Sequence, residues 1–248
     1  MPQADLQLRP SGLLLFIQYG FMPNHLGYCG GNENQELLEH AVAGQSEPAL
    51  ASLLAKFTGA FPYLKTIAEA NKITDPFDPK VVEAYWLGNG LLDRVTPGHM
   101  ARALDDRFGK QLTRKMRDQI FGKLPQGGRP FHLFHVIDVY RHLESKEISV
   151  MAMENCRISW GTVKGIEPGE LVVDRRPLIA KGNKLVLGPG RTEKVMRNLD
   201  GKGFVDQARV GDTVSIHWGW ACQVLTVRQA ENLVRYSEQH LRLANQTI

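Results

Sequence analysis

The pattern of hydrophobic residues changes near residue 150, and this change limits the fold more than any other feature of the sequence. Before it, apolar residues recur at helical spacing, as in EPALASLLAKFTGAF (47–61). After it, short runs such as GELVVD and NKLVLG are rich in β-formers and separated by Gly, Pro and Asn. The sequence therefore predicts an α+β protein, with an all-α domain over residues 1–149 and a small β-barrel or sandwich with a terminal helix over residues 150–248.

Helix start and stop signals support this division. Asp78 and Thr96 are good N-capping residues, and each is followed by a proline at the first helical position. Thr226 is a matching N-cap for an amphipathic helix at the end of the chain. A glycine-rich segment, PNHLGYCGGNEN (23–34), predicts a loop. The predicted helices of the first domain cover residues 33–44, 47–61, 78–95, 96–108 and 129–145.

Composition excludes several classes of protein. The chain of 248 residues is 43% hydrophobic and 23% charged, which is ordinary for a globular protein. Its formal net charge of +4 is too small to predict nucleic-acid binding. No apolar run of about 18 residues predicts a membrane span, and residues 11–22 lack the basic leader of a signal peptide. The cysteines Cys29, Cys156 and Cys222 form no CxxC pair, so we expect free thiols and a cytoplasmic location.

The stretch VGDTVSIHWGWACQVLT (210–226) carries a candidate ligand at the end of a predicted strand. Side chains alternate between the two faces of a strand, so Val214, Ile216 and Trp218 are expected to share the core face. His217 then lies on the polar face, where its ring meets solvent or a ligand. A solvent-exposed strand histidine without a special role is the alternative interpretation.

Two motifs in the second domain point to a known family. The first is CRISWGTVKGIEPGELVVD, which begins at Cys156, and the second is VGDTVSIHWGWACQVLTVRQAENLVRYSEQH. A cysteine followed by a Pro-Gly and a strand, then a VGD turn, a strand ending in His-x-Gly-aromatic-Ala and a helix, resembles the HypC/HupF family of [NiFe]-hydrogenase maturation chaperones. The resemblance covers residues 156–240.

The resemblance implies a fold and a function. It implies an OB-like barrel with a terminal helix, acting as a carrier rather than an enzyme. With a maturation scaffold protein, such a chaperone carries iron with cyanide and carbon monoxide ligands to the hydrogenase large-subunit precursor. The functional cysteine and histidine of the family match Cys156 and His217. The first domain resembles an uncharacterised helical family found fused to such tails, through runs such as NHLGYCGG, EAYWLGNGLLD and FHVIDVYR.

A second metal site is a separate hypothesis for the helical domain. His132, His135 and Asp138 recur every three residues of a predicted helix, and two imidazoles with a carboxylate suit non-haem iron. His25 and Cys29 lie four residues apart in the glycine-rich loop and could share a metal. This set predicts an iron-dependent enzyme with the barrel as a docking module. The alternatives are a polar histidine pair between helices and an ordinary glycine turn.

Other side chains have open roles. Trp160, Trp218 and Trp220 could stack on bases, which gives a nucleic-acid-binding OB-like module as a further hypothesis, although Trp218 is expected in the core. Cys222 is either a buried thiol or an added metal ligand.

Tyr85, with Glu83, could add polar groups from a facing helix. No P-loop, GxGxxG, GxSxG or zinc-finger spacing occurs.

Overall fold

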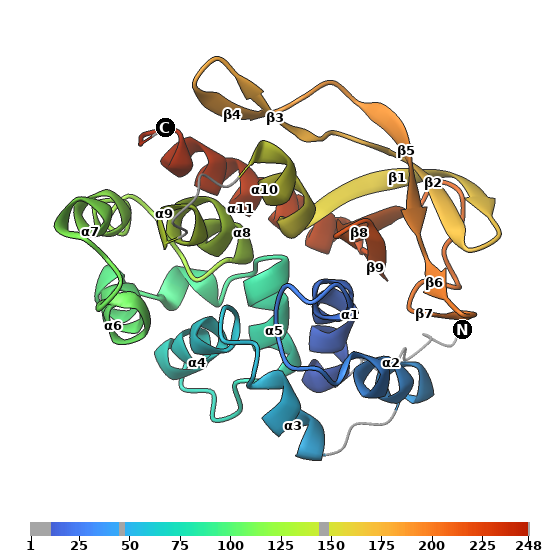
Figure 1. Cartoon of the computed structure of the whole chain (residues 1–248), viewed down its shortest axis with the longest axis horizontal. Coiled ribbons are helices and arrows are strands. Elements are labelled where there is room, and N and C mark those ends of the chain that lie inside the picture. The colour runs from blue at the N-terminus through green and yellow to red at the C-terminus, as the bar shows by residue number, and fades with distance from the viewer. Residues whose placement is uncertain (1–10, 45–47, 144–148, 248) are drawn as a thin grey trace, which may run out of the picture.

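The computed structural model of the chain describes residues 11–44, 48–143 and 149–247. An N-terminal helical region is followed by a five-stranded mixed sheet that closes in a ring and by a C-terminal helix (Figure 1). This arrangement confirms the predicted α+β class. The division into two domains at residue 150 stays a prediction.

The helices of the described residues agree with most of the predicted ranges. Thr226 caps the last helix with a full capping box, as predicted. The predicted helix 78–95 ends early, because Gly88 takes a φ of +84°. Helices α1, α4, α7 and α10 were not predicted from the sequence. The helices are α1 (Gly12–His25), α2 (Asn34–Ala43), α3 (Pro48–Leu54), α4 (Phe61–Ala70), α5 (Pro79–Trp86), α6 (Pro97–Phe108), α7 (Arg114–Phe121), α8 (His132–Phe134), α9 (Arg141–Leu143), α10 (Val150–Cys156) and α11 (Val227–Ala244), with a 3-10 turn at Leu92–Arg94 and a π-helix at His135–Tyr140.

The strands form one ring and two short hairpins. They are β1 (Ser159–Glu167), β2 (Glu170–Arg175), β3 (Leu178–Lys181), β4 (Lys184–Leu187), β5 (Arg191–Met196), β6 (Asn198–Leu199), β7 (Lys202–Gly203), β8 (Thr213–His217) and β9 (Trp220–Val224). The ring runs β1-β2-β5-β9-β8, and a parallel contact of Met196 with Trp220 closes it. Hairpins β3–β4 and β6–β7 lie outside the ring. Small aliphatic side chains, including Val163, Val173 and Val214, fill its interior.

Helix α1 joins the helical region to the ring of strands. It is apolar all round, so it is buried on nearly every side. It packs on α5 and also against β8 and β9 (Figure 1). The larger hydrophobic core consequently continues from the helices into Trp220 and Cys222 of β9 and Tyr236 of α11.

The contact with α1 corrects the prediction for the end of β8. Val214 and Ile216 point into the ring, as predicted. His217 does lie on the opposite face, but it is only 2% exposed, because α1 covers that face. The prediction of an exposed His217 is therefore wrong.

Trp218 is a second correction. It takes a φ of +53° in the turn after β8, so the strand alternation ends at His217. Its side chain is half-buried and stacks on Tyr28, outside the interior of the ring. Trp220 is the fully buried tryptophan of this segment.

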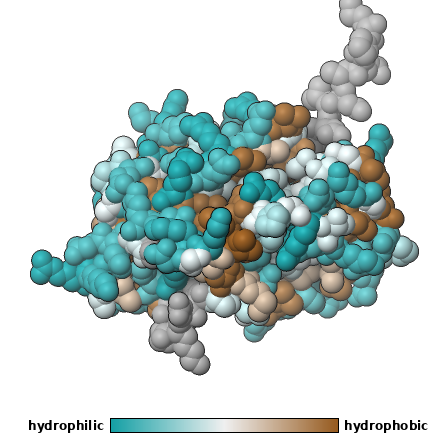
Figure 2. Space-filling view, turned by 90° about the horizontal axis from the view of Figure 1, so that it is seen from above, coloured by the Kyte–Doolittle hydropathy of each residue, from teal (hydrophilic) through white to brown (hydrophobic). Residues whose placement is uncertain are grey.

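The surface seen from above in Figure 2 is mostly hydrophilic, with hydrophobic residues gathered near its middle. No helix within the described ranges is long and apolar enough to cross a membrane.

The packing of α11 gives a test of the fold. A Cβ on Gly88 would overlap the ring of Tyr236, whose hydroxyl donates to the carbonyl of Asn89 at 3.1 Å. Gly44 also has a positive φ, of +67°, but a Cβ there meets nothing within 4 Å. We expect Gly88→Ala to lower the free energy of unfolding by about 3 kcal/mol and Gly44→Ala by about 1 kcal/mol, because only the first adds a clash to backbone strain. Urea denaturation measures both, and equal losses would contradict this packing.

Candidate metal centre

Three metal-ligating side chains meet where the helical region contacts the ring of strands. They are His132 of α8, Cys156 at the end of α10 and His217 at the end of β8. One ligand atom of each lies within 4.8 Å of the other two. No other set of three His, Cys, Asp or Glu side chains in the described residues is so arranged. The group combines one member of the predicted helical site with both members of the predicted barrel site.

Backbone contacts bring the segments of Cys156 and His217 together. Ser149 caps α10 by accepting a hydrogen bond from the N–H of Ala152, and the helix then ends at Cys156. The N–H of Trp218 donates to the carbonyl of Asn155 at 2.9 Å. The residue after His217 is thus bonded to the residue before Cys156, which fixes the two ligands beside each other.

His217 has a free lone pair in a buried site. Its Nδ1 lies 2.7 Å from the carbonyl oxygen of Tyr19 in α1. A carbonyl only accepts, so Nδ1 carries the proton and Nε2 is the unprotonated nitrogen. That Nε2 makes no hydrogen bond of normal geometry, although the carbonyl of Cys156, which already accepts from His132, lies near enough to act on the ring. Burial lowers the pKa of His217 to about 4, so the ring is neutral at pH 7. A neutral imidazole whose other nitrogen donates to a carbonyl is the usual state of a metal ligand.

His132 is held at both nitrogens. Its Nε2 lies 2.7 Å from the carbonyl of Cys156, and its Nδ1 lies 3.0 Å from the hydroxyl of Tyr85. Nε2 therefore donates and Nδ1 accepts. For Nε2 to bind a metal, His132 must take the other tautomer and donate Nδ1–H to the Tyr85 oxygen. The Tyr85 hydroxyl can then donate to the carbonyl of Gly59, which lies 3.4 Å away.

Cys156 supplies the sulfur of the group. Burial raises the pKa of its thiol to about 12, so the thiol is protonated at neutral pH. A metal ion must displace that proton to bind sulfur. Two imidazoles with one thiolate suit zinc, cobalt, iron and copper better than magnesium or calcium. The buried group can therefore bind a transition metal.

Aromatic rings enclose the two histidines. The ring of Trp86 lies 4.7 Å from His132 and 5.7 Å from His217, measured between centroids, and it stacks on Tyr19. This wall keeps water away, which raises the cost of leaving His217 Nε2 without a partner.

The row His132, His135 and Asp138 does not form one site. His135 contacts the Tyr63 hydroxyl through Nδ1 at 3.3 Å, and Asp138 forms a buried ion pair with Lys123. The cause is the π-helix over residues 135–140, whose wider turn rotates side chains three residues apart onto different faces. The hypothesis of a site within the helical region fails for this set.

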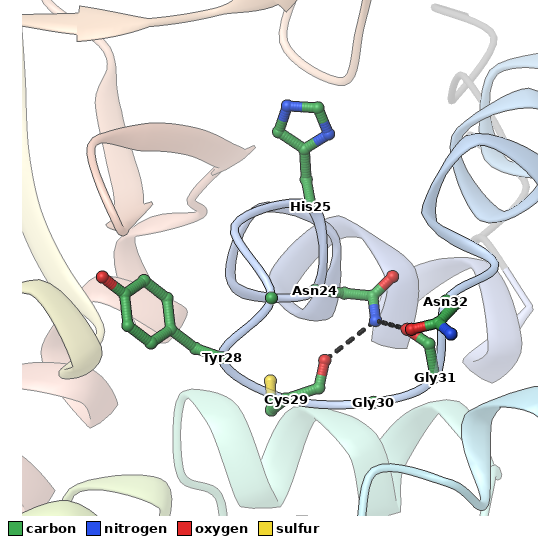
Figure 3. Close-up of a pocket in the computed structure, with 8 residues that line it drawn as sticks. Asn24, His25, Tyr28, Cys29, Gly30, Gly31 and Asn32 are labelled. Atoms are coloured by element: carbon green, nitrogen blue, oxygen red, sulfur yellow. Dashed lines mark hydrogen bonds between the residues drawn. The ribbon is translucent and has the colours of Figure 1, made fainter.

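His25 and Cys29 do not form the predicted shared metal site. In Figure 3 their side chains extend from different sides of the segment that carries them. The loop is fixed instead by Asn24, whose Nδ2 donates to the carbonyl of Cys29 at 2.8 Å. Burial raises the pKa of the Cys29 thiol to about 12, and the charge of Cys156 adds to the rise.

The remaining candidate side chains have structural partners. Cys222 is fully buried, lies outside the metal-competent group and donates weakly from Sγ to the carbonyl of Trp220 at 3.4 Å. Glu83 accepts from Asn89 and Gln229 at 3.2 and 2.9 Å. Trp220 is inaccessible to a base, and Trp218 already stacks on Tyr28, so the three tryptophans form no common stacking surface.

Comparison with known proteins identifies a family but no activity. The chain belongs to a family of unknown function, DUF6390, whose model matches residues 8–248. No curated protein and no solved structure matches the sequence. The resemblance of residues 156–240 to the HypC/HupF family stays a prediction.

The buried histidines make the metal-free protein sensitive to acid. Burial lowers the pKa of His217, His135 and His240 to about 4, and that of His132 well below its usual value. Unfolded histidines titrate near pH 6.5, so the unfolded state binds more protons at pH 5 and stability falls as the pH drops from about 7 to 5. We expect a lower melting temperature at pH 5 than at pH 7.

The variant His217→Asn provides the control for this effect. The Asn amide can still donate to Tyr19 but does not titrate, so the melting temperature should fall less between pH 7 and pH 5. Equal melting temperatures of the native chain at the two pH values would contradict the assigned neutral histidines.

Proposed function

We propose that this protein binds one transition-metal ion through His132, Cys156 and His217 and serves as a metal-handling accessory protein. The single observation that carries the proposal is the buried Nε2 of His217, which makes no hydrogen bond of normal geometry and lies in a group with a thiol and a second imidazole. Leaving a buried polar atom unpaired costs about 1–3 kcal/mol, and a bound metal offsets that cost.

The number of ligands favours transfer of a metal over permanent storage. Structural zinc sites are closed by four protein ligands, whereas sites with three protein ligands keep a position for an exchangeable group. Two imidazoles and one thiolate give three. The fourth position would accept a small ligand or a donor atom of a partner protein.

The finer form of the proposal is a role in hydrogenase maturation. The two residues that the resemblance to the HypC/HupF family assigns to the iron centre, Cys156 and His217, belong to this group. We propose that the metal is iron with its diatomic ligands, delivered with a scaffold protein to a [NiFe]-hydrogenase large-subunit precursor. The helical region would add a third ligand, His132, and the aromatic wall around it.

Binding of Co(II) as a probe tests the site. We expect one Co(II) per chain, with an absorption band from thiolate-to-metal charge transfer. Cys156→Ser should abolish the band, and His217→Asn should weaken binding by about 100-fold. Cys222→Ala is the matched control and should bind as the native chain does. Retention of the full band in Cys156→Ser would overturn the proposed ligand set.

The pH dependence of binding tests the assigned protonation states. Only the Cys156 thiol releases a proton, because both histidines are neutral and the tautomer change at His132 releases none. The logarithm of the association constant should therefore rise by about one per pH unit between about pH 6 and 8. Titration in buffers of different pH measures this slope. A slope near two would show that a protonated histidine is also displaced.

The hydrogenase role is tested in the host. Cys156→Ala should lower [NiFe]-hydrogenase activity and leave the level of the protein unchanged, because it removes a single sulfur atom from a half-buried side chain at the edge of the larger core. The native chain should co-purify with the large-subunit precursor. Full hydrogenase activity in the Cys156→Ala strain would contradict the carrier role. It would not contradict metal binding, which the Co(II) experiment tests separately.

A further inference from the structure

The outer face of α11 carries a line of charged side chains that form no ion pair. The inner face of this helix is buried in the larger core. The exposed charges of the outer face lie four, three and four positions apart, and they are Glu231, Arg235, Glu238 and Arg242. The only side-chain partner of the four within the described residues is the ring of Tyr236, 5.3 Å from the guanidinium carbon of Arg235. The line therefore holds charges that can pair with another molecule.

A groove runs beside this line of charges, between α11 and the ring of strands. It has a volume of about 660 Å³, and Trp160 of β1 and Thr213 of β8 form part of its wall. Val227, Ala230 and Val234 line it on the helix side. Val227 is 77% exposed, and Ala230 and Val234 are half-buried. An apolar strip bordered by unpaired charges resembles the core and rim of a protein–protein interface.

The order of the charges is complementary to itself. Along α11 the signs alternate, starting with the negative charge of Glu231. If a second copy of the helix lies antiparallel, Glu231 of each copy is opposite Arg242 of the other. In the same register, Arg235 of each copy is opposite Glu238 of the other. A parallel arrangement in register would instead put like charges opposite each other, which is unfavourable.

We propose that this face of α11 is the interface of a homodimer, in which the two helices pack antiparallel about a two-fold axis. Such an axis makes every contact twice, so four ion pairs form from one line of charges. The aliphatic stems of the charged side chains cover apolar surface, which excludes water from the groove. The proposal does not depend on the metal site.

The composition of the interface sets the expected strength of the dimer. Helix α11 has 18 residues, so the contact is about 27 Å long. Charged and small apolar side chains form most of it, without a large buried anchor. We therefore expect a weak, reversible dimer with a Kd of about 10 µM.

Sedimentation velocity of the full, metal-free chain tests the proposal. A reductant keeps the exposed Cys29 thiols from linking two copies. The native chain should sediment mainly as a dimer at about 100 µM and low salt. Raising the NaCl concentration from about 0.05 to 0.5 M should weaken association, because salt screens exposed ion pairs.

Charge reversals at the centre of the line test the pairing. Arg235→Glu and Glu238→Arg each put like charges opposite each other at two symmetric contacts, so each should weaken the dimer by about 100-fold. Lys65→Glu, at an exposed residue of α4, is the matched control and should dimerise as the native chain does. All three residues are exposed, so folding of the variants is expected and is checked by circular dichroism.

A mixture of the two central variants provides a rescue experiment. Arg235→Glu leaves two negative charges at the centre of the line, and Glu238→Arg leaves two positive charges there. The mixed dimer therefore regains opposite charges at both central contacts. We expect the mixture to associate with near-native affinity, although each variant alone stays mainly monomeric at about 100 µM.

Each other outcome would overturn the proposal. A native chain that stays monomeric up to about 500 µM would rule out the homodimer and leave the groove to a different partner protein. Native affinity in both central variants would rule out this face of α11 as the interface. Weakening in both variants without rescue in the mixture would rule out the antiparallel pairing. Equal weakening by Lys65→Glu would show that net charge, rather than this face, controls association.

Discussion

The hydrogen bond from His217 Nδ1 to the carbonyl of Tyr19 is the contact on which the candidate site depends. It ties the last residue of β8 to α1, so it fixes how the ring of strands meets the helical region. It also sets the tautomer of His217, with the proton on Nδ1, and leaves a lone pair on Nε2. The same contact therefore determines both the packing of the two parts and the chemistry available between them.

The sequence predicted the elements better than the contacts between them. Local signals placed the helix cap at Thr226, the strand alternation at Val214 and Ile216, and the change of structure near residue 150. The alternation of side chains along β8 could not predict the burial of His217. A strand has two faces, and no local signal indicates that a distant helix covers one of them. The apolar run SGLLLFIQYGFM (11–22) was the available hint, because a helix that is apolar all round must pack on nearly every side.

The candidate ligand set was predicted in pieces. Cys156 and His217 were paired through a family resemblance, whereas His132 was assigned to a different site in the helical region. The π-helix separated His132 from His135 and Asp138, and a π-helix has no signal in residue spacing. Tyr85 was foreseen only as a polar group from a facing helix, and its bond to His132 Nδ1 became evident from the tertiary structure. The site thus needs both halves of the chain, in keeping with a family model that spans nearly all of it.

X-ray absorption at the zinc edge of the zinc-loaded chain tests the central claim most directly. We expect one sulfur neighbour at about 2.3 Å and two imidazole nitrogens at about 2.0–2.1 Å, with a lighter atom in the remaining position. The sulfur should be lost in Cys156→Ser. A shell of oxygen and nitrogen alone in the native chain, unchanged by Cys156→Ser, would contradict a metal centre built from His132, Cys156 and His217.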